Sequence, residues 1–144
     1  DLDIAQLMAS VETPAVYVLD NAPNCRADRI NAHSVEFFRV LRDAHPDVPV
    51  VIVEHPLYPT MRLNNAERED IIARNNAQKA FYEKLRKAGE KRIYYVPGDK
   101  LLDEMKEGTV DGDHFTDLGV TYYAKALLPT IKKALKASPN KVGK

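Results

Sequence analysis

The sequence predicts an α/β protein in which helices cover both faces of a parallel β-sheet, giving three layers. Short apolar runs at residues 15–19, 48–53 and 92–96 alternate with longer segments of helical periodicity. These runs are apolar on both faces, which is typical of parallel strands that helices cover from both sides. The connecting segments are long enough for the right-handed crossovers that join neighbouring parallel strands.

The first part of the chain predicts one helix and one strand. Helical periodicity ends before Pro14, because the residue before a proline disfavours the helical conformation. Residues 15–19 follow as a buried strand, and residues 20–25 as a loop. The apolar positions that define the face of this helix are Ile4, Leu7, Met8 and Val11.

Two further helix and strand units are predicted next. A helix from about residue 26 to residue 44 precedes the β-branched strand at residues 48–53. A longer helix then ends at Gly89, before the strand at residues 92–96. The apolar positions of the two helices are Ile30, Phe37, Phe38 and Leu41 in the first, and Ile71, Ile72, Phe81, Tyr82 and Leu85 in the second.

The last predicted element is a helix from about Thr116 to Ala137, with Pro129 as a kink. Its apolar positions are Val120, Tyr123, Leu127 and Ile131. Three loops follow the predicted strands, at residues 20–25, 54–63 and 97–114. Ligands of parallel sheets collect at the carboxyl ends of the strands, so these loops are expected to form one functional rim.

Composition and charge narrow the classes of function. A chain of 144 residues with 44% hydrophobic and 29% charged residues predicts a single folded domain over residues 1–144. Lys and Arg number 21, and so do Asp and Glu, so no net charge attracts nucleic acid. No apolar run is long enough to span a membrane. The single Cys25 excludes an internal disulfide and a four-cysteine zinc site, and leaves the compartment open.

The strongest sequence signal for chemistry is Asp111-Gly112-Asp113-His114, on a turn that opens the last predicted helix. A carboxylate three residues before a histidine can hold the imidazole Nδ1–H and leave Nε2 free to accept a proton from a nucleophile. The only serines lie outside any Gly-rich nucleophile turn; they are Ser10, Ser34 and Ser138. We therefore expect the serine nucleophile to lie outside these 144 residues.

The strand at residues 15–19 points to the same conclusion from the fold. It is apolar on both faces, which is typical of a central strand rather than a protected edge. Three strands also make a narrow sheet for two layers of helices. We expect a missing N-terminal segment or a second chain to pair beside this strand, and the start of the sequence at Asp1 rather than Met agrees with a missing segment.

Along the chain, a strand is followed by Asp20 to Asn24, then come two more strand and helix units, and Asp111 to His114 precede the last helix. This order of motifs resembles the later part of an SGNH/GDSL hydrolase. The resemblance implies a flavodoxin-like sheet of which only the later three strands are present. By position, it implies that Asn24 donates to an oxyanion, that His114 is the general base and that Asp111 orients it. The blocks with the serine and the oxyanion glycine have no counterpart.

The resemblance is incomplete at two positions. Pro23-Asn24 stands where the family usually has Gly-x-Asn-Asp, and Phe115 replaces a proline that often follows the histidine. The family activity implied is hydrolysis of a small ester, such as an acetyl ester of a carbohydrate, through an acyl enzyme and without a cofactor. A bacterial, exported location is favoured over the cytoplasm.

Several alternatives stay open at this point. Asn24 could instead cap the helix that starts near Arg26. The protein could be a binding or scaffold relative without a nucleophile, or a metal-dependent hydrolase using Asp111, Asp113 and His114, although a compact run makes a poor metal site. We interpret Glu54 and His55 as a solvated loop start. The histidine at the core or boundary of its helix is His33, and the tyrosine pairs, Tyr94-Tyr95 and Tyr122-Tyr123, are interpreted as core and surface residues.

Overall fold

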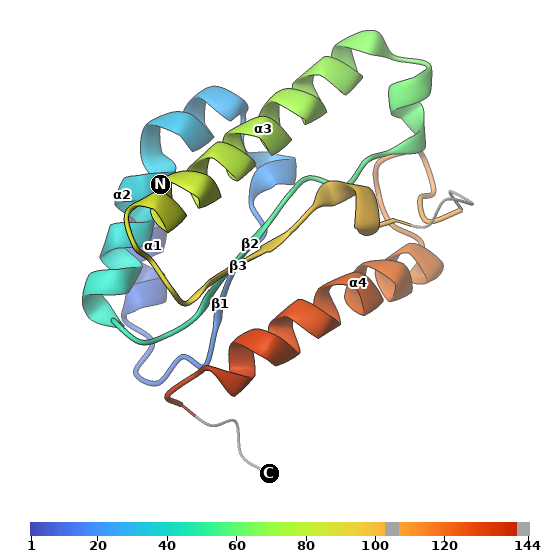
Figure 1. Cartoon of the computed structure of the whole chain (residues 1–144). Helices are drawn as coiled ribbons and strands as arrows, with labels where there is room; N and C mark the ends of the chain where they lie inside the picture. The colour runs from blue at the N-terminus through green and yellow to red at the C-terminus, as the bar shows by residue number, and fades with distance from the viewer. Residues whose placement is uncertain (103–106, 141–144) are drawn as a thin grey trace.

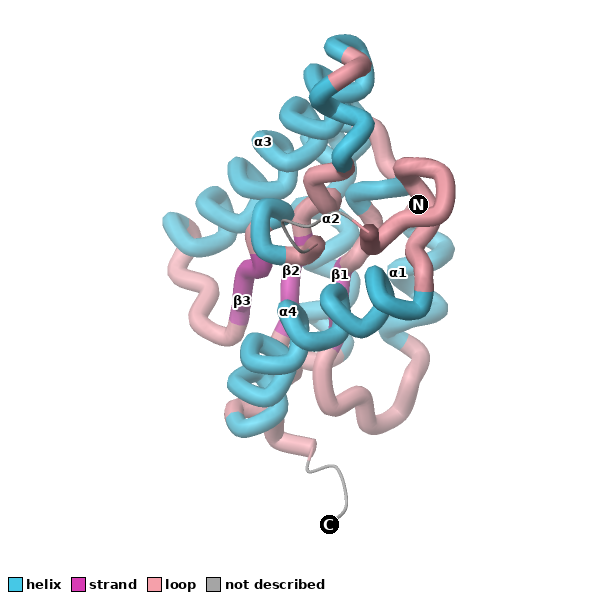
Figure 2. Tube along the Cα trace, turned by 90° about the vertical axis from the view of Figure 1, so that its right-hand side faces the viewer, coloured by secondary structure: helices cyan, strands magenta, loops and turns pink. Residues whose placement is uncertain are grey.

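The computed structural model describes residues 1–102 and 107–140, and its α/β architecture agrees with the predicted fold class. Three parallel strands form one sheet in the order β1 (Tyr17–Leu19), β2 (Val50–Val53) and β3 (Ile93–Val96). Figure 2 shows the three strands side by side in this order, with α4 in front of them. The four α-helices are α1 (Leu2–Ala9), α2 (Ala27–Ala44), α3 (Asn65–Lys87) and α4 (Asp117–Lys136).

The strands β1 and β2 begin two residues later than the sequence predicts. Pro14 and Pro49 lie near these starts, and a proline cannot donate a hydrogen bond to a β-ladder. The ladder between β1 and β2 begins where the Tyr17 N–H donates to the Pro49 carbonyl, at 2.9 Å. Short 3-10 helices follow each strand; they are η1 (Ala22–Asn24), η2 (Pro59–Arg62) and η3 (Gly98–Lys100).

The helices form layers on both faces of the sheet. Helices α1, α2 and α3 lie on one face and α4 lies on the other (Figure 1). Successive strands are added in one direction, so the right-handed crossovers through α2 and α3 place both helices on the same face. Helix α4 follows β3, continues through Pro129 and packs across the opposite face.

The larger hydrophobic core lies between the sheet and the pair α2 and α3. Phe38 and Leu41 of α2 are fully buried there, and the Phe38 ring meets the edge of Phe81 at a centroid distance of 6.4 Å. Truncating Phe38 to alanine would cost about 3–5 kcal/mol of unfolding free energy. The opposite face has a smaller core between α4 and the sheet, with Val51, Val53 and Ala134 buried.

Most of the apolar face predicted for the first helix is not buried, and Met8 alone of its four positions packs against the larger core. Ala5 is the only residue of α1 that is fully buried, whereas Ile4 and Leu7 are 51% and 67% exposed. Periodicity identifies an apolar face, but burial requires a partner, and α1 packs on α2 through its Ala5 side. Within residues 1–102 and 107–140, nothing covers Ile4 and Leu7.

A groove opens at the free edge of β1. No strand of the described part of the chain pairs with this edge, because β1 is the outer strand of the sheet. Val18 and Leu19, whose side chains point to opposite faces of β1, both line a cavity of about 420 Å³ together with Ile4, Met8 and Phe37. We call this cavity the edge groove. Because both faces of the strand contribute to it, the edge groove follows the strand edge itself.

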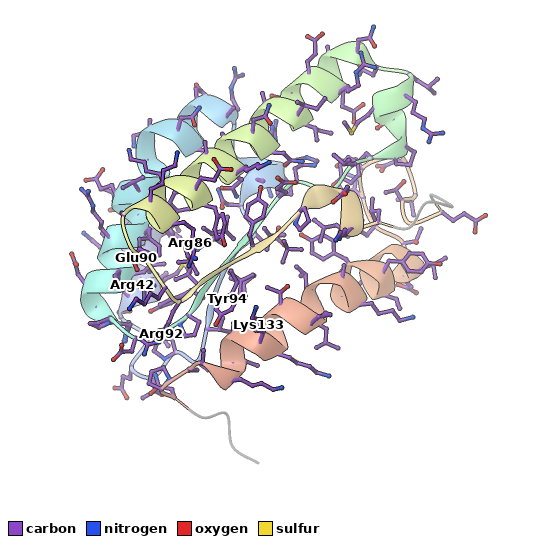
Figure 3. All side chains as sticks on the ribbon, viewed as in Figure 1. Arg42, Arg86, Glu90, Arg92, Tyr94 and Lys133 are labelled. Carbon is purple, nitrogen blue, oxygen red and sulfur yellow. The ribbon has the colours of Figure 1, made fainter. Side chains whose placement is uncertain are left out.

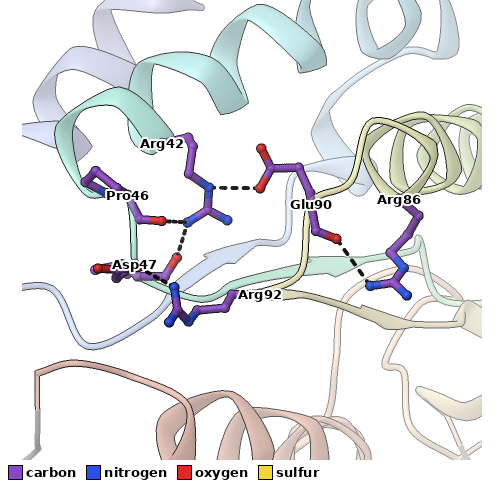
Figure 4. Close-up of polar contacts among 7 residues, drawn as sticks. Arg42, Pro46, Asp47, Arg86, Glu90 and Arg92 are labelled. Carbon is purple, nitrogen blue, oxygen red and sulfur yellow. Dashed lines mark hydrogen bonds and ion pairs between the residues drawn. The ribbon is translucent and has the colours of Figure 1, made fainter.

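Charged side chains gather at the amino end of the sheet, where β2 and β3 begin (Figure 3). Arg42 Nη1 donates to the carbonyls of Pro46 and Val48 at 2.9 and 2.8 Å, and its Nε donates to Glu90 at 3.2 Å (Figure 4). We call this group the arginine cluster; it consists of Arg42, Asp47, Arg86, Glu90 and Arg92. Lys133 of α4 points toward the Tyr94 ring on the other face of the sheet, 5.9 Å from its centroid.

No helix in the described ranges is both long and apolar enough to cross a membrane.

Candidate active site

The turn before α4 places the predicted acid and histidine at the carboxyl side of the sheet. Thr116 is the N-cap of α4, because its hydroxyl accepts a hydrogen bond from the Gly119 N–H at 3.0 Å. The Val110 N–H donates to the His114 carbonyl at 2.8 Å and closes the loop. Gly112 has a φ of +96°, a conformation that favours glycine. We call residues 111–114 the dyad turn.

Asp111 and His114 form a dyad within this turn. His114 Nδ1 donates to Asp111 Oδ2 at 2.7 Å. Asp111 Oδ1 accepts the backbone N–H groups of His114 and Asp113, at 2.8 and 3.0 Å. The carboxylate is therefore oriented by the backbone of the same residues that carry its partner. With Nδ1–H engaged, the neutral imidazole has its lone pair on Nε2.

Hydrogen bonds and charge shift the titration of both groups. The His114 backbone N–H, followed by its side chain, lowers the pKa of Asp111 well below its ordinary range. The hydrogen bond to Asp111 and the negative charges of Asp111 and Asp113 raise the pKa of His114 above 6.5. The His114 side chain is 76% exposed, so solvent and substrate can reach it. The arrangement can hold a proton acceptor in a fixed tautomer at the protein surface.

Asn24 and His114 come from different loops and share a cavity. Both residues line a space of about 340 Å³, which we call the rim pocket. Asn24 ends η1, and α2 begins with Arg26 at its N-cap without a side-chain cap. The alternative in which Asn24 caps this helix is therefore wrong. The role of Asn24 as an oxyanion donor stays a prediction, as do the catalytic roles of His114 and Asp111.

Two tyrosines in the wall of the rim pocket were not identified as site residues from the sequence. Tyr123 of α4 donates its hydroxyl to Asp20 Oδ1 at 2.7 Å, and burial, followed by this hydrogen bond, raises its pKa. Tyr58 precedes η2 and is only 8% exposed. The remaining wall residues are Pro23, Pro56, Asp113 and Phe115. The sequence did not identify Tyr123 as a pocket residue, because its hydrogen-bond partner Asp20 lies 103 residues away.

Polar side chains of α3 position the loops of the rim. Arg74 Nη1 donates to the carbonyls of Ala22 and Pro23, at 3.2 and 2.6 Å, and thereby fixes the turn that ends at Asn24. Asn75 exchanges two hydrogen bonds with the backbone of His55, at 2.7 and 2.9 Å. Gln78 Nε2 donates to the Val53 carbonyl at 3.1 Å. The sequence feature that could have identified these residues is the presence of polar side chains on the buried face of α3.

The loop after β2 begins differently from its prediction. His55 is only 5% exposed, so the interpretation of a solvated loop start is wrong for this residue. Its backbone is held by Asn75, and its Nδ1 lies 2.7 Å from the Pro56 carbonyl. Burial is the main cause that lowers the pKa of His55. His33 also differs from its prediction, because it is exposed and lines the edge groove.

None of the serines lines the rim pocket. Ser10 is the C-cap of α1, Ser34 lines the edge groove, and Ser138 is buried with its hydroxyl donating to the Asn140 carbonyl at 3.0 Å. In residues 1–102 and 107–140, no three His, Cys, Asp or Glu side chains converge as a metal site requires. The alternative metal site of Asp111, Asp113 and His114 therefore has no ligand set in this part of the chain. Residues 103–106 of the expected loop 97–114 lie outside the described residues.

Solved structures provide two comparisons. A protein from Bacteroides ovatus described as a GDSL-like lipase is 32% identical, with a TM-score of 0.89 over 99% of this chain and 42% of that chain. Salicylyl-acyltransferase SsfX3 from a tetracycline biosynthetic pathway is 19% identical and shares the fold, with a TM-score of 0.70 over 98% of this chain and 43% of that chain. The chain thus spans less than half the length of each of these structures.

No curated protein sequence matches the chain. The model of the GDSL-like lipase/acylhydrolase family matches residues 1–132, which is most of the chain and includes Asn24, Asp111 and His114. The sequence match and the fold agree, and the chain belongs to the GDSL-like lipase/acylhydrolase family.

Proposed function

We propose that this chain carries the histidine, the acid and one oxyanion donor of a serine esterase or acylhydrolase. Its substrate would be a small ester, such as an acetyl ester of a carbohydrate. The observation that carries the proposal is the rim pocket, which Asn24 and His114 line together while Asp111 holds the imidazole from behind, at 2.7 Å. A base and a neutral amide donor across a small cavity suit the attack of an alcohol on an ester carbonyl.

Each residue has a separate role in the proposed reaction. His114 Nε2 accepts the proton of the serine hydroxyl as it attacks the ester carbonyl, and then returns this proton to the leaving alcohol. Asp111 keeps Nδ1 protonated and stabilises the imidazolium cation. The Asn24 amide donates to the developing oxyanion. A water molecule, deprotonated by His114, then hydrolyses the acyl enzyme and regenerates the serine.

The serine would come from a strand that pairs beside β1. In a parallel ladder, alternate residues direct their backbone groups to the same side. Tyr17 donates to β2, so Val18 directs its N–H and carbonyl toward the free edge. A strand bound there would bury the edge groove, and its carboxyl end would meet the rim near Asp20 and Asn24. A preceding segment of the same polypeptide is the occupant that we propose.

The full-length polypeptide containing this chain provides the test. A fluorophosphonate probe should label one serine outside the 144 residues, and the same protein should hydrolyse p-nitrophenyl acetate. His114→Ala should abolish both reactions. Adding a primary alcohol separates hydrolysis from acyl transfer, because an acyltransferase would form the new ester.

Two results would favour the other functions. A full-length protein that binds ligands but neither reacts with the probe nor releases p-nitrophenol would be a binding relative without a nucleophile. Turnover that is abolished by a chelator and insensitive to the probe would indicate metal-dependent hydrolysis. Turnover restored by mixing full-length His114→Ala with a variant that lacks the labelled serine would place a second copy, rather than a preceding segment of the same polypeptide, beside β1.

A further inference from the structure

The loop that follows β2 contacts the dyad turn directly. Thr60 of η2 lies against Gly112, and a Cβ atom added to Gly112 would be 2.2 Å from the Thr60 Cγ2 atom. The Thr60 hydroxyl lies 3.4 Å from the Gly112 carbonyl and donates to Glu67 Oε1 at 2.8 Å. Thr60 thus joins the backbone between Asp111 and His114 to the first turn of α3. Figure 1 shows this loop, in green, next to the orange loop before α4.

Tyr58, two residues before Thr60, lies against the residues that follow Gly112. Its ring meets the edge of Phe115, with a centroid distance of 6.4 Å, and Phe115 directly follows His114. Tyr58 and Asp113 both line the rim pocket, and burial together with the negative charge of Asp113 raises the pKa of Tyr58. Thr60 and Tyr58 therefore lie beside Gly112, Asp113 and Phe115, which surround the histidine.

Both contact residues are themselves held in place. Tyr58 is buried with Met61 and Ile71, and its ring lies 5.0 Å from the His55 ring at 75°. The backbone of His55 is fixed by Asn75 of α3. Glu67, which accepts from Thr60, lies in the first turn of α3, where its N–H is capped by Asn64 at 3.2 Å. The loop thus links the dyad turn to the long helix of the other face.

We infer that Thr60 and Tyr58 are positioning residues that hold the His114–Asp111 dyad at the rim pocket. The inference rests on the proposed function, because it concerns the geometry of the proposed base. The dyad needs such support because the hydrogen bonds of the Asp111 carboxylate and the His114 imidazole are all within the turn, and the Val110 N–H bond to the His114 carbonyl only closes the same loop. They orient His114 relative to Asp111, but they do not fix the turn relative to Asn24, which belongs to a different loop.

The test compares the full-length protein with the variant Thr60→Ala/Tyr58→Phe. This variant removes the methyl against Gly112 and the hydroxyl beside Asp113, but retains the aromatic packing of residue 58. The matched control is Thr121→Ala/Tyr95→Phe. It removes a threonine hydroxyl bonded to the Asp117 carbonyl and a tyrosine hydroxyl bonded to Glu54, and neither contacts the dyad turn.

We expect kcat for p-nitrophenyl acetate to fall about tenfold in the test variant, because misplacement of a catalytic group lowers the rate of the chemical step. KM should stay within about twofold of the wild type if the loss is one of positioning. The imidazole ¹⁵N spectrum of His114 gives a second readout. Its pKa should move down toward the ordinary value, because Thr60 packs on Gly112, whose backbone conformation keeps Asp111 and His114 in contact. The control should leave kcat and the His114 spectrum unchanged.

The inference is overturned if the test variant and the control have the same kcat and the same His114 titration. It is also overturned if kcat falls only in proportion to the unfolded fraction, measured by circular dichroism at the assay temperature. If the wild type lacks ester turnover, the proposed function fails, but the His114 spectrum still decides whether Thr60 and Tyr58 position the dyad.

Discussion

The two ends of the sheet hold polar clusters whose side chains are used in different ways. In the arginine cluster, Arg42 is 14% exposed, and its donors are directed to Glu90 and to two backbone carbonyls (Figure 4). At the carboxyl end, His114 is largely exposed, and its Nε2 makes no hydrogen bond to the described residues. In the first cluster Arg42 Nε and Nη1 are bonded within the fold, although its buried Nη2 has no partner among the described residues, whereas the second cluster retains a free lone pair on His114 Nε2.

This difference separates stability from chemistry. Arg42 connects α2 to the segments before β2 and β3, so its removal takes a charged donor from two backbone carbonyls and from Glu90. His114 contacts little beyond its own turn, so its removal should disturb the fold very little. Variants at the two ends should therefore change different observables.

The largest expected effect is the loss of the proposed base. His114→Ala in the full-length protein should lower ester turnover by at least about 10³-fold, because the serine loses its proton acceptor. The melting temperature should not change, since the side chain is exposed. Turnover and thermal unfolding measured on the same sample check this prediction.

His45→Ala is the matched control at the amino end. His45 Nε2 lies 2.9 Å from the Ala9 carbonyl and joins α2 to α1. This variant should lower the melting temperature without changing turnover. Equal turnover in wild type and His114→Ala would show that His114 is not the catalytic base.

The next effect concerns the oxyanion donor. Asn24→Ala should lower kcat about 100-fold, because an amide donor toward the developing charge is lost. Asn24→Asp, which has the same shape but no donor, should be at least as slow. Steady-state kinetics measure both. If Asn24→Ala keeps kcat within about twofold of the wild type, Asn24 only lines the pocket.

The arginine cluster gives a smaller effect, on stability alone. Arg42→Ala should lower the unfolding free energy by about 2 kcal/mol, because two carbonyls and Glu90 lose a charged donor. Urea denaturation measures this change, and kcat should be unaffected.

Arg92→Ala is the comparison variant within the cluster. The pair of Arg92 and Asp47 is exposed, so its loss should cost less than about 1 kcal/mol. If Arg92→Ala lowered the unfolding free energy more than Arg42→Ala, burial would not explain which arginine stabilises the fold.

The smallest expected effect is a shift in pH dependence. The proposed mechanism requires neutral His114, whose pKa is raised above 6.5 by Asp111. The value of kcat/KM should therefore fall on the acid side, through an inflection above 6.5. In Asp111→Asn the residual activity should have its inflection at lower pH, because the carboxylate that favours the imidazolium is gone. An unchanged inflection would mean that another group titrates.

The dyad turn shows why part of the site could be predicted. Asp111, Gly112 and His114 are neighbours in sequence, and their hydrogen bonds close within four residues. The same is true of Thr116, which caps the helix that it begins. Local hydrogen bonding and local backbone conformation can be inferred from sequence, because the partners are adjacent.

Tyr58, Thr60 and Tyr123 show why the rest could not. Each acts on a residue of another loop or helix, and Thr60 meets Gly112 across 52 positions. The polar stripe of α3 has the same character, since Arg74 and Gln78 reach loops that follow β1 and β2. A tyrosine or an arginine has many suitable partners, and only the packing of the elements decides which one it meets.

The sequence by itself determined the parallel α/β class, the order of helices and strands, and the acid and histidine of the dyad turn. These features follow from periodicity and from contacts between near neighbours. The tertiary structure alone decided that Tyr58 and Tyr123 line the pocket shared by Asn24 and His114, that Thr60 and Tyr58 hold the dyad turn, and that Ile4 and Leu7 of α1 stay exposed. Burial and long-range contact depend on which surfaces meet, and a one-dimensional pattern does not specify these meetings.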